Sequence, residues 1–196
     1  AAYTQVRRNR QTVGYMIATV FITACLFAYI TAAEQIFVDV YDLGAAFPIA
    51  FGAIAISISV GTFLNSRIVV RHGMRRVSHT MTLWFTASGL VFAVLALTVG
   101  VSLSAFMVLL ALTFSVIGLT TSNFNALAME PMGRIAGAAS AVFGAVTSAG
   151  GAALGALIAR AFDGTIAPFV LGLLVAGLAT IAALLWTERG KLTLRA

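Results

Sequence analysis

The sequence predicts an all-α membrane protein with six transmembrane helices. Of its 196 residues, 61% are hydrophobic and 9% are charged, and the mean hydropathy is +1.03. A soluble globular protein carries about 25% charged residues, so a soluble enzyme of this length is excluded. Disorder is excluded as well, because disordered chains are polar and charged. Two further observations support the prediction, namely six long apolar segments and a one-sided distribution of basic residues.

Each of the six apolar segments is long enough to cross a bilayer, which takes about 20 residues of helix. Strands of a membrane barrel would be about 10 residues long and would alternate in polarity, so these segments predict helices. Together they fill nearly the whole chain and predict a single transmembrane domain over residues 1–196. The segments cover residues 12–36, 45–70, 77–99, 104–129, 135–161 and 166–186.

The basic residues indicate the orientation of these helices. Eleven of the twelve Lys and Arg residues lie before the first segment or at and beyond the ends of the second, fourth and sixth. The opposite side holds Arg160 and most of the acidic residues. Because short cytoplasmic loops carry an excess of Lys and Arg, both termini are predicted to be cytoplasmic. The net charge of +6 then marks the cytoplasmic face, and no nucleic-acid partner is expected.

Polar side chains on the first and fourth segments predict a substrate cavity between them, because polar groups inside a membrane usually face the bundle interior or a water-filled cavity. An isolated Thr hydroxyl also bonds to its own helix, so plain packing stays open as the alternative for each threonine. Glu34 equally fits an interfacial carboxylate. The candidate cavity residues are Thr19, Thr23, Phe27, Thr31, Glu34, Gln35, Thr120, Asn123 and Asn125.

The turn after the second segment combines glycines, an amide and several arginines. Gly73 gives the backbone freedom for a tight turn, and arginines there can bond helix carbonyls or a carboxylate. Glu130, at the end of the fourth segment, is a natural partner for Arg71 or Arg75 and predicts a salt-bridged latch. Two alternatives to the latch stay open. The arginines would then only fix the orientation of the helices, and Glu130 would be a solvated loop residue. The motif comprises Gly61, Asn65, Arg67, Arg71, Gly73, Arg75 and Arg76, with Glu130.

The fifth segment is rich in small residues at four-residue spacing. Such faces let membrane helices approach closely, so this helix is predicted to be central and tightly packed. The packing candidates are Ser140, Gly144, Ser148, Gly151 and Gly155.

Nothing in the sequence indicates catalysis or a cofactor. Cys25 is the only cysteine, and His72 and His79 lie at a predicted turn without a cluster of Cys or acidic residues, so no metal site is expected. No histidine on another segment is placed to activate Ser140 at membrane depth, so no catalytic residues are expected.

Three stretches resemble the C-terminal half of a major facilitator superfamily transporter, and most closely its bacterial Bcr/CflA-type multidrug efflux branch. They read FLNSRIVVRHGMRR, NFNALAMEPMGRIAGAASAVFG and LGALIARAFDGTIAPFVLG, the last followed by LLWTERG. The resemblance covers the whole chain and implies half of a major facilitator fold, in which the six segments are the seventh to twelfth spans.

The resemblance implies proton antiport of drug-like small molecules by alternating access in the bacterial inner membrane. It also implies a cytoplasmic gating turn formed by Gly61, Arg71, Gly73, Arg75 and Arg76. Asn65 stands where the better-kept copy of this signature has an acid, and Glu130 would complete the network instead. The implied partners are the lipid bilayer, the N-terminal six-helix half, the drug-like substrate and protons.

Two alternatives stay open on the sequence alone. One is a self-sufficient six-span protein that homodimerises as a transporter or channel, and the other is a membrane interaction module without transport. The chain begins Ala1-Ala2-Tyr3 without Met, and the stretch up to Arg10 resembles a central cytoplasmic loop. We therefore expect this sequence to be part of a longer protein.

Overall fold

The computed structural model describes residues 2–193, and in these residues it contains helices and loops but no strand. The prediction of an all-helical protein is confirmed. Five continuous helical stretches are long and apolar enough to cross a bilayer, and one of them, Leu103–Arg160, joins two long helices. The long helices are α2 (Arg10–Glu34), α3 (Phe47–His72), α4 (Met74–Thr98), α5 (Leu103–Met129), α6 (Ala136–Arg160) and α7 (Ala167–Thr187). The short ones are α1 (Ala2–Arg8), η1 (Gln35–Val40), η2 (Gly44–Ala46) and η3 (Glu130–Ile135).

Local chemistry explains where several helices begin and end. Asn9 caps α2 by accepting a hydrogen bond from the Thr12 N–H at 3.0 Å, since the first amides of a helix lack partners within it. Gly73 separates α3 from α4 with a φ of +78°, a conformation that glycine adopts without strain. Pro131 follows the end of α5, where a proline would interrupt a continuing helix.

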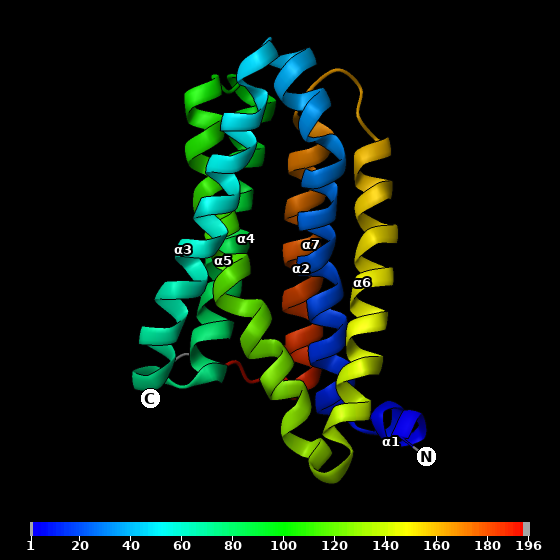
Figure 1. Cartoon of the computed structure of the whole chain (residues 1–196). Helices are drawn as coiled ribbons and strands as arrows, with labels where there is room; N and C mark the ends of the chain where they lie inside the picture. The colour runs from blue at the N-terminus through cyan, green and yellow to red at the C-terminus, as the bar shows by residue number, and fades with distance from the viewer. Residues whose placement is uncertain (1, 194–196) are drawn as a thin grey trace.

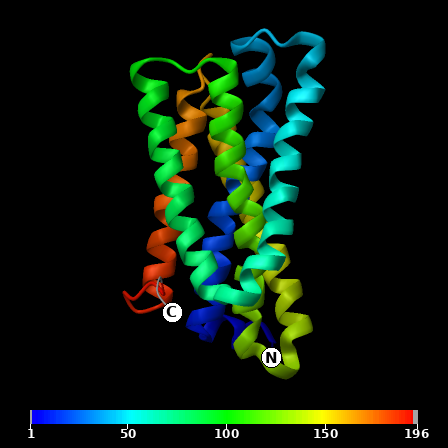
Figure 2. The same ribbon diagram turned by 90° about the vertical axis from the view of Figure 1, so that its left-hand side faces the viewer.

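The six long helices form two three-helix blocks, α2–α4 and α5–α7, that pack in equivalent ways (Figures 1 and 2). Helix α2 packs on α6 and α7 of the second block, and α5 packs on α3 and α4 of the first. The remaining large contacts, α2 on α5 and α4 on α7, join corresponding helices of the two blocks. If α2, α3 and α4 are exchanged for α5, α6 and α7, each of these contacts becomes another contact of the same set, so the packing pattern is unchanged. Because each block has three helices, the second runs along the bundle in the opposite direction to the first.

The corresponding pairs α3–α5 and α2–α6 both approach through glycines. A Cβ atom on Gly61 would overlap the carbonyl oxygen of Ser115, and one on Gly118 would lie 2.7 Å from the amide nitrogen of Thr62. In the other pair, a Cβ on Gly155 would lie 2.6 Å from the Cβ of Phe27. Small residues allow this close backbone packing between membrane helices.

Helix α6 lies at the edge of the bundle, which differs from the central position expected from its composition. Its main neighbour is α2, and Gly151 and Gly155 face that helix. The other expected packing residues, Ser140, Gly144 and Ser148, are exposed. The small residues therefore lie on two faces of α6, one against α2 and one uncovered in this chain.

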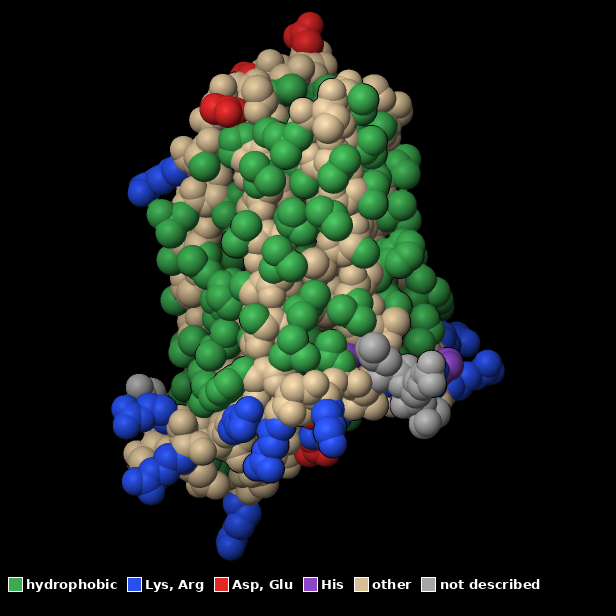
Figure 3. Space-filling view, turned by 180° about the vertical axis from the view of Figure 1, so that it is seen from behind, with side chains coloured by type: hydrophobic (Ala, Val, Ile, Leu, Met, Phe, Trp, Pro, Cys, Tyr) green, Lys and Arg blue, Asp and Glu red, His purple; other side chains and the backbone are tan. Residues whose placement is uncertain are grey.

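The two ends of the bundle differ in charge. Both termini lie at one end (Figure 1), where most of the Lys and Arg side chains gather, whereas most of the acidic side chains lie at the opposite end (Figure 3). We call the end that holds Arg71, Arg134 and Arg189 the basic end. The opposite end is closed by packed aromatic rings, in which Tyr29 stacks on Phe51 with centroids 5.1 Å apart.

Candidate functional site: a polar network at the basic end

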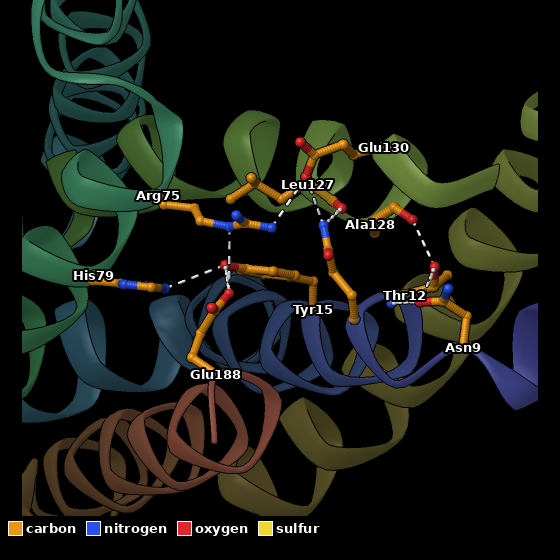
Figure 4. Close-up of polar contacts among 10 residues, drawn as sticks. Asn9, Thr12, Tyr15, Arg75, His79, Leu127, Ala128, Glu130 and Glu188 are labelled. Atoms are coloured by element: carbon orange, nitrogen blue, oxygen red, sulfur yellow. Dashed lines mark hydrogen bonds and ion pairs between the residues drawn. The ribbon is translucent and has the colours of Figure 1, made fainter. Parts of the chain in front are cut away.

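A single arginine joins two carboxylates at the basic end. Arg75, in the first turn of α4, places Nη2 3.1 Å from Oε2 of Glu130 and Nε 3.5 Å from Oε1 of Glu188 (Figure 4). Glu130 follows α5 and Glu188 follows α7, so Arg75 connects three helix ends. The Glu188 side chain is 18% exposed, whereas that of Glu130 is 55% exposed. The pair with Glu188 is therefore the less hydrated of the two, whereas the pair with Glu130 is the shorter one and is also a hydrogen bond.

Tyr15 adds α2 to this network. Its hydroxyl donates a hydrogen bond of 2.7 Å to Oε1 of Glu188 and lies 3.2 Å from Nε2 of His79 (Figure 4). The Tyr15 ring is fully buried and packs on Phe124 of α5 with centroids 5.5 Å apart. The ring thus fixes the hydroxyl at the point where α2, α4 and α7 meet.

His79 is fully buried, one helical turn after Arg75 on the same face of α4. Its Nδ1 accepts a hydrogen bond of 3.0 Å from the backbone N–H of Thr193. An accepting Nδ1 carries no proton, so in the neutral ring Nε2 holds the proton and donates to Tyr15. The hydrogen bonds therefore run in one direction, from Thr193 through His79 and Tyr15 to Glu188.

Polar side chains at the start of α2 bind the end of α5. Gln11 Nε2 donates bonds of 2.7 Å to both the Leu127 carbonyl and Oε2 of Glu130, and Thr12 donates one of 2.8 Å to the Ala128 carbonyl. The last carbonyls of a helix lack partners within it, and here side chains of another helix supply them.

We call Tyr15, Arg75, His79, Glu130 and Glu188 the polar network. It joins α2, α4, α5 and α7 at one end of the bundle, and one cation in it faces two carboxylates. In this arrangement the group links the ends of four helices through ion pairs and hydrogen bonds. It offers neither an activated nucleophile nor, among the described residues, a cluster of metal ligands.

The latch predicted from sequence brings together Glu130 and Arg75 rather than Arg71. Arg71 is exposed and has no ion pair among the described residues. Arg67 lies over the Phe63 ring, 5.4 Å from its centroid. Sequence reasoning missed Tyr15, His79 and Glu188 as members of the network. The four-residue spacing of Arg75 and His79 was an available signal, because it places both on one face of a helix.

The candidate cavity residues have different surroundings within residues 2–193. Thr23 and Phe27 face the glycines of α6. Thr19 and Thr120 are buried, and their hydroxyls bond carbonyls of their own helices, the alternative that sequence had left open. Thr31, Glu34, Gln35 and Asn125 are exposed.

Asn123 is buried against Asn65 instead of facing a cavity. Each amide donates to the other, at 3.1 and 2.8 Å, and Asn123 also donates to the Leu119 carbonyl at 2.9 Å. The two side chains are 3% and 7% exposed, and they join α3 to α5 beyond the Gly61 contact. Asn65, expected to belong to the gating turn, thus serves as a buried link between two helices.

Replacing Asn123 by leucine should destabilise the bundle, because it leaves the Asn65 amide buried without a partner. Interhelical hydrogen bonds in membranes contribute about 0.6 kcal/mol on average and up to about 1.7 kcal/mol, and we expect a loss near the upper value. A double replacement, Asn65→Leu with Asn123→Leu, should recover part of the loss, since it removes both polar groups. Thermal unfolding in detergent measures both effects, and strictly additive losses would contradict the paired arrangement.

Comparison with known proteins gives one distant relative. No protein-family model matches the chain, and no solved structure matches it. A bicyclomycin resistance protein homolog of Haemophilus influenzae is 28% identical over 166 residues, which cover 83% of this chain. The chain is distantly homologous to that protein. The matched part spans 41% of the relative's own length.

Proposed function

We propose that this chain is the C-terminal six-helix half of a membrane transporter that exports drug-like small molecules by proton antiport and alternating access. The observation that carries the proposal is the equivalent packing of the two three-helix blocks. Nested inverted repeats of three helices are the architecture of each half of a major facilitator transporter. The sequence motifs that resemble the Bcr/CflA branch support the same assignment.

The distant relative supports a role in drug resistance, because its name records resistance to bicyclomycin. The match spans about two fifths of that protein, a share that agrees with a half-transporter. In this proposal the other half packs against the uncovered face of α6, which exposes Ser140, Gly144 and Ser148. The excess of Lys and Arg supports placing the basic end in the cytoplasm of a bacterial cell, with the protein in its inner membrane.

The polar network is proposed to be the cytoplasmic latch of this half. It holds the ends of α2, α4, α5 and α7 in one arrangement, and a transporter must release such contacts when its access changes. Alternating access is largely a rigid-body motion of one repeat or bundle against another. A network of exposed and half-buried charges suits this role, because its ion pairs are modest in energy and can exchange for water.

Expression of the complete gene in a bacterium that lacks its own multidrug pumps tests the proposal. We expect the cells to tolerate more bicyclomycin and to accumulate less of it than cells with an empty vector. Collapsing the proton gradient should abolish the difference, because export would lose its energy source. Equal accumulation in both strains, with the protein detected in the membrane, would contradict transport and favour an interaction module.

A further inference from the structure

A groove runs between α3 and α4 at the basic end. Its volume is about 230 Å³, and its deeper part is apolar, formed by Ile68, Val77, Met81 and Leu119. Leu119 belongs to α5 and forms the floor behind the two helices. Arg76 and His72 line the same groove nearer the turn that joins α3 to α4. One elongated site therefore has an apolar inner part and a cationic mouth.

A second hollow adjoins this mouth and adds more positive charge. It has a volume of about 480 Å³, shares Ile68 and His72 with the groove, and is lined by Arg67 and Arg71. Its other walls include the exposed Val70, so apolar surface lies beside the charges here too.

The arginines of this corner have no carboxylate partner among the described residues. Both acids of the basic end, Glu130 and Glu188, are paired with Arg75. The other four acidic residues lie in the loops and helix ends at the opposite end of the bundle. Arg67, Arg71 and Arg76 thus form a cationic corner that the described protein does not neutralise.

We propose that the groove between α3 and α4 binds an anionic phospholipid, with its phosphate at Arg71 and Arg76 and an acyl chain over Val77, Met81 and Leu119. Basic pockets between transmembrane helices on the cytoplasmic side suit anionic headgroups. The apolar inner part distinguishes a lipid from a free phosphate, which would find no partner there. The inference places the lipid in the cytoplasmic leaflet and so takes the orientation proposed above, but it does not depend on transport.

Native mass spectrometry of the complete, delipidated protein in neutral detergent tests this site. Phosphatidylglycerol should bind more tightly than phosphatidylcholine of the same acyl chains. In the double variant Arg71→Gln, Arg76→Gln we expect the affinity for phosphatidylglycerol to fall about thirtyfold, because each basic residue near the headgroup adds about fivefold. The control, Arg8→Gln with Arg134→Gln, removes two exposed charges from the same end outside the groove and should leave the preference unchanged.

Two further arms decide the outcome. Glycerophosphoglycerol, the same headgroup without acyl chains, should compete only weakly, and competition equal to that of the lipid would overturn the proposal in favour of a soluble phosphate ester. Replacing the exposed Thr80 of the groove wall by tryptophan should weaken binding while the arginines remain. Equal binding of both lipids, or equal losses in the groove and control variants, would also overturn it. Lipid binding in detergent is independent of drug export, so failure here leaves the proposed transport untouched.

Discussion

Replacing Arg75 by glutamine should strongly impair drug export while the protein still inserts into the membrane. The change leaves Glu130 and the less hydrated Glu188 without their shared cation. Removing one partner of a fully buried ion pair costs about 3–5 kcal/mol, and we expect about 1–3 kcal/mol here because water reaches part of this group. An energy of that size shifts a conformational equilibrium about 5–150-fold, enough to hold the transporter in the wrong state. Export of bicyclomycin at matched protein levels measures the effect.

Arg134→Gln is the matched control for this experiment. Arg134 lies at the same end of the bundle and has the same charge, but it is exposed and pairs with neither acid of the network. Its export activity should therefore stay close to that of the unaltered protein. The double variant Arg75→Gln, Glu130→Gln should lose less than the sum of its single losses, because the two residues share one interaction. Equal defects in Arg134→Gln and Arg75→Gln would show that only the net charge of the basic end matters.

Replacing Gly118 by alanine should strongly destabilise the bundle. The new Cβ would overlap the Ile58 carbonyl oxygen and lie 2.7 Å from the Thr62 amide nitrogen, so α3 and α5 would have to separate. Overpacking of a well-packed interior costs about 1–3 kcal/mol and occasionally more, and backbone contacts leave little room to relax. Separation would also pull apart Asn65 and Asn123. Size-exclusion chromatography after heating in detergent measures the loss.

Gly52→Ala is the control for this variant, because Gly52 lies in α3, one of the two helices of this contact. A Cβ at Gly52 would have no atom within 4 Å, and alanine favours helix by about 1 kcal/mol over glycine. The variant should therefore be as stable as the unaltered protein or slightly more so. If Gly118→Ala unfolded at the same temperature as Gly52→Ala, the close contact between α3 and α5 would be wrong.

The helices of this protein could be predicted from sequence because the membrane imposes a simple rule. A segment that crosses lipid must be apolar, about 20 residues long and internally hydrogen-bonded, and each of these requirements leaves a local signal. The charged turns at Gly73 and Pro131 marked the breaks for the same reason. The segments predicted over residues 45–70 and 104–129 thus differ by a few residues from α3 and α5.

The partners of individual side chains could not be predicted, because they depend on how the helices are aligned with one another. Nothing local in the sequence places Tyr15 beside Glu188, which is 173 positions away. The same limit applies to Asn123, whose polarity suggested a cavity although α3 supplies Asn65 as its partner. Gly61 of α3 and Gly118 of α5 set the depth of that contact. Close packing through small residues was predicted only for α6, and Gly61 was expected in the gating turn.

The most direct test of the proposed function is drug transport by the complete purified protein in liposomes. We predict that bicyclomycin moves across the membrane when a pH gradient is imposed, and that reversing the gradient reverses the direction of transport. The Arg75→Gln variant should lose this movement, whereas Arg134→Gln should retain it. Absence of transport, or transport at the same rate without a gradient, would contradict a proton-driven exporter.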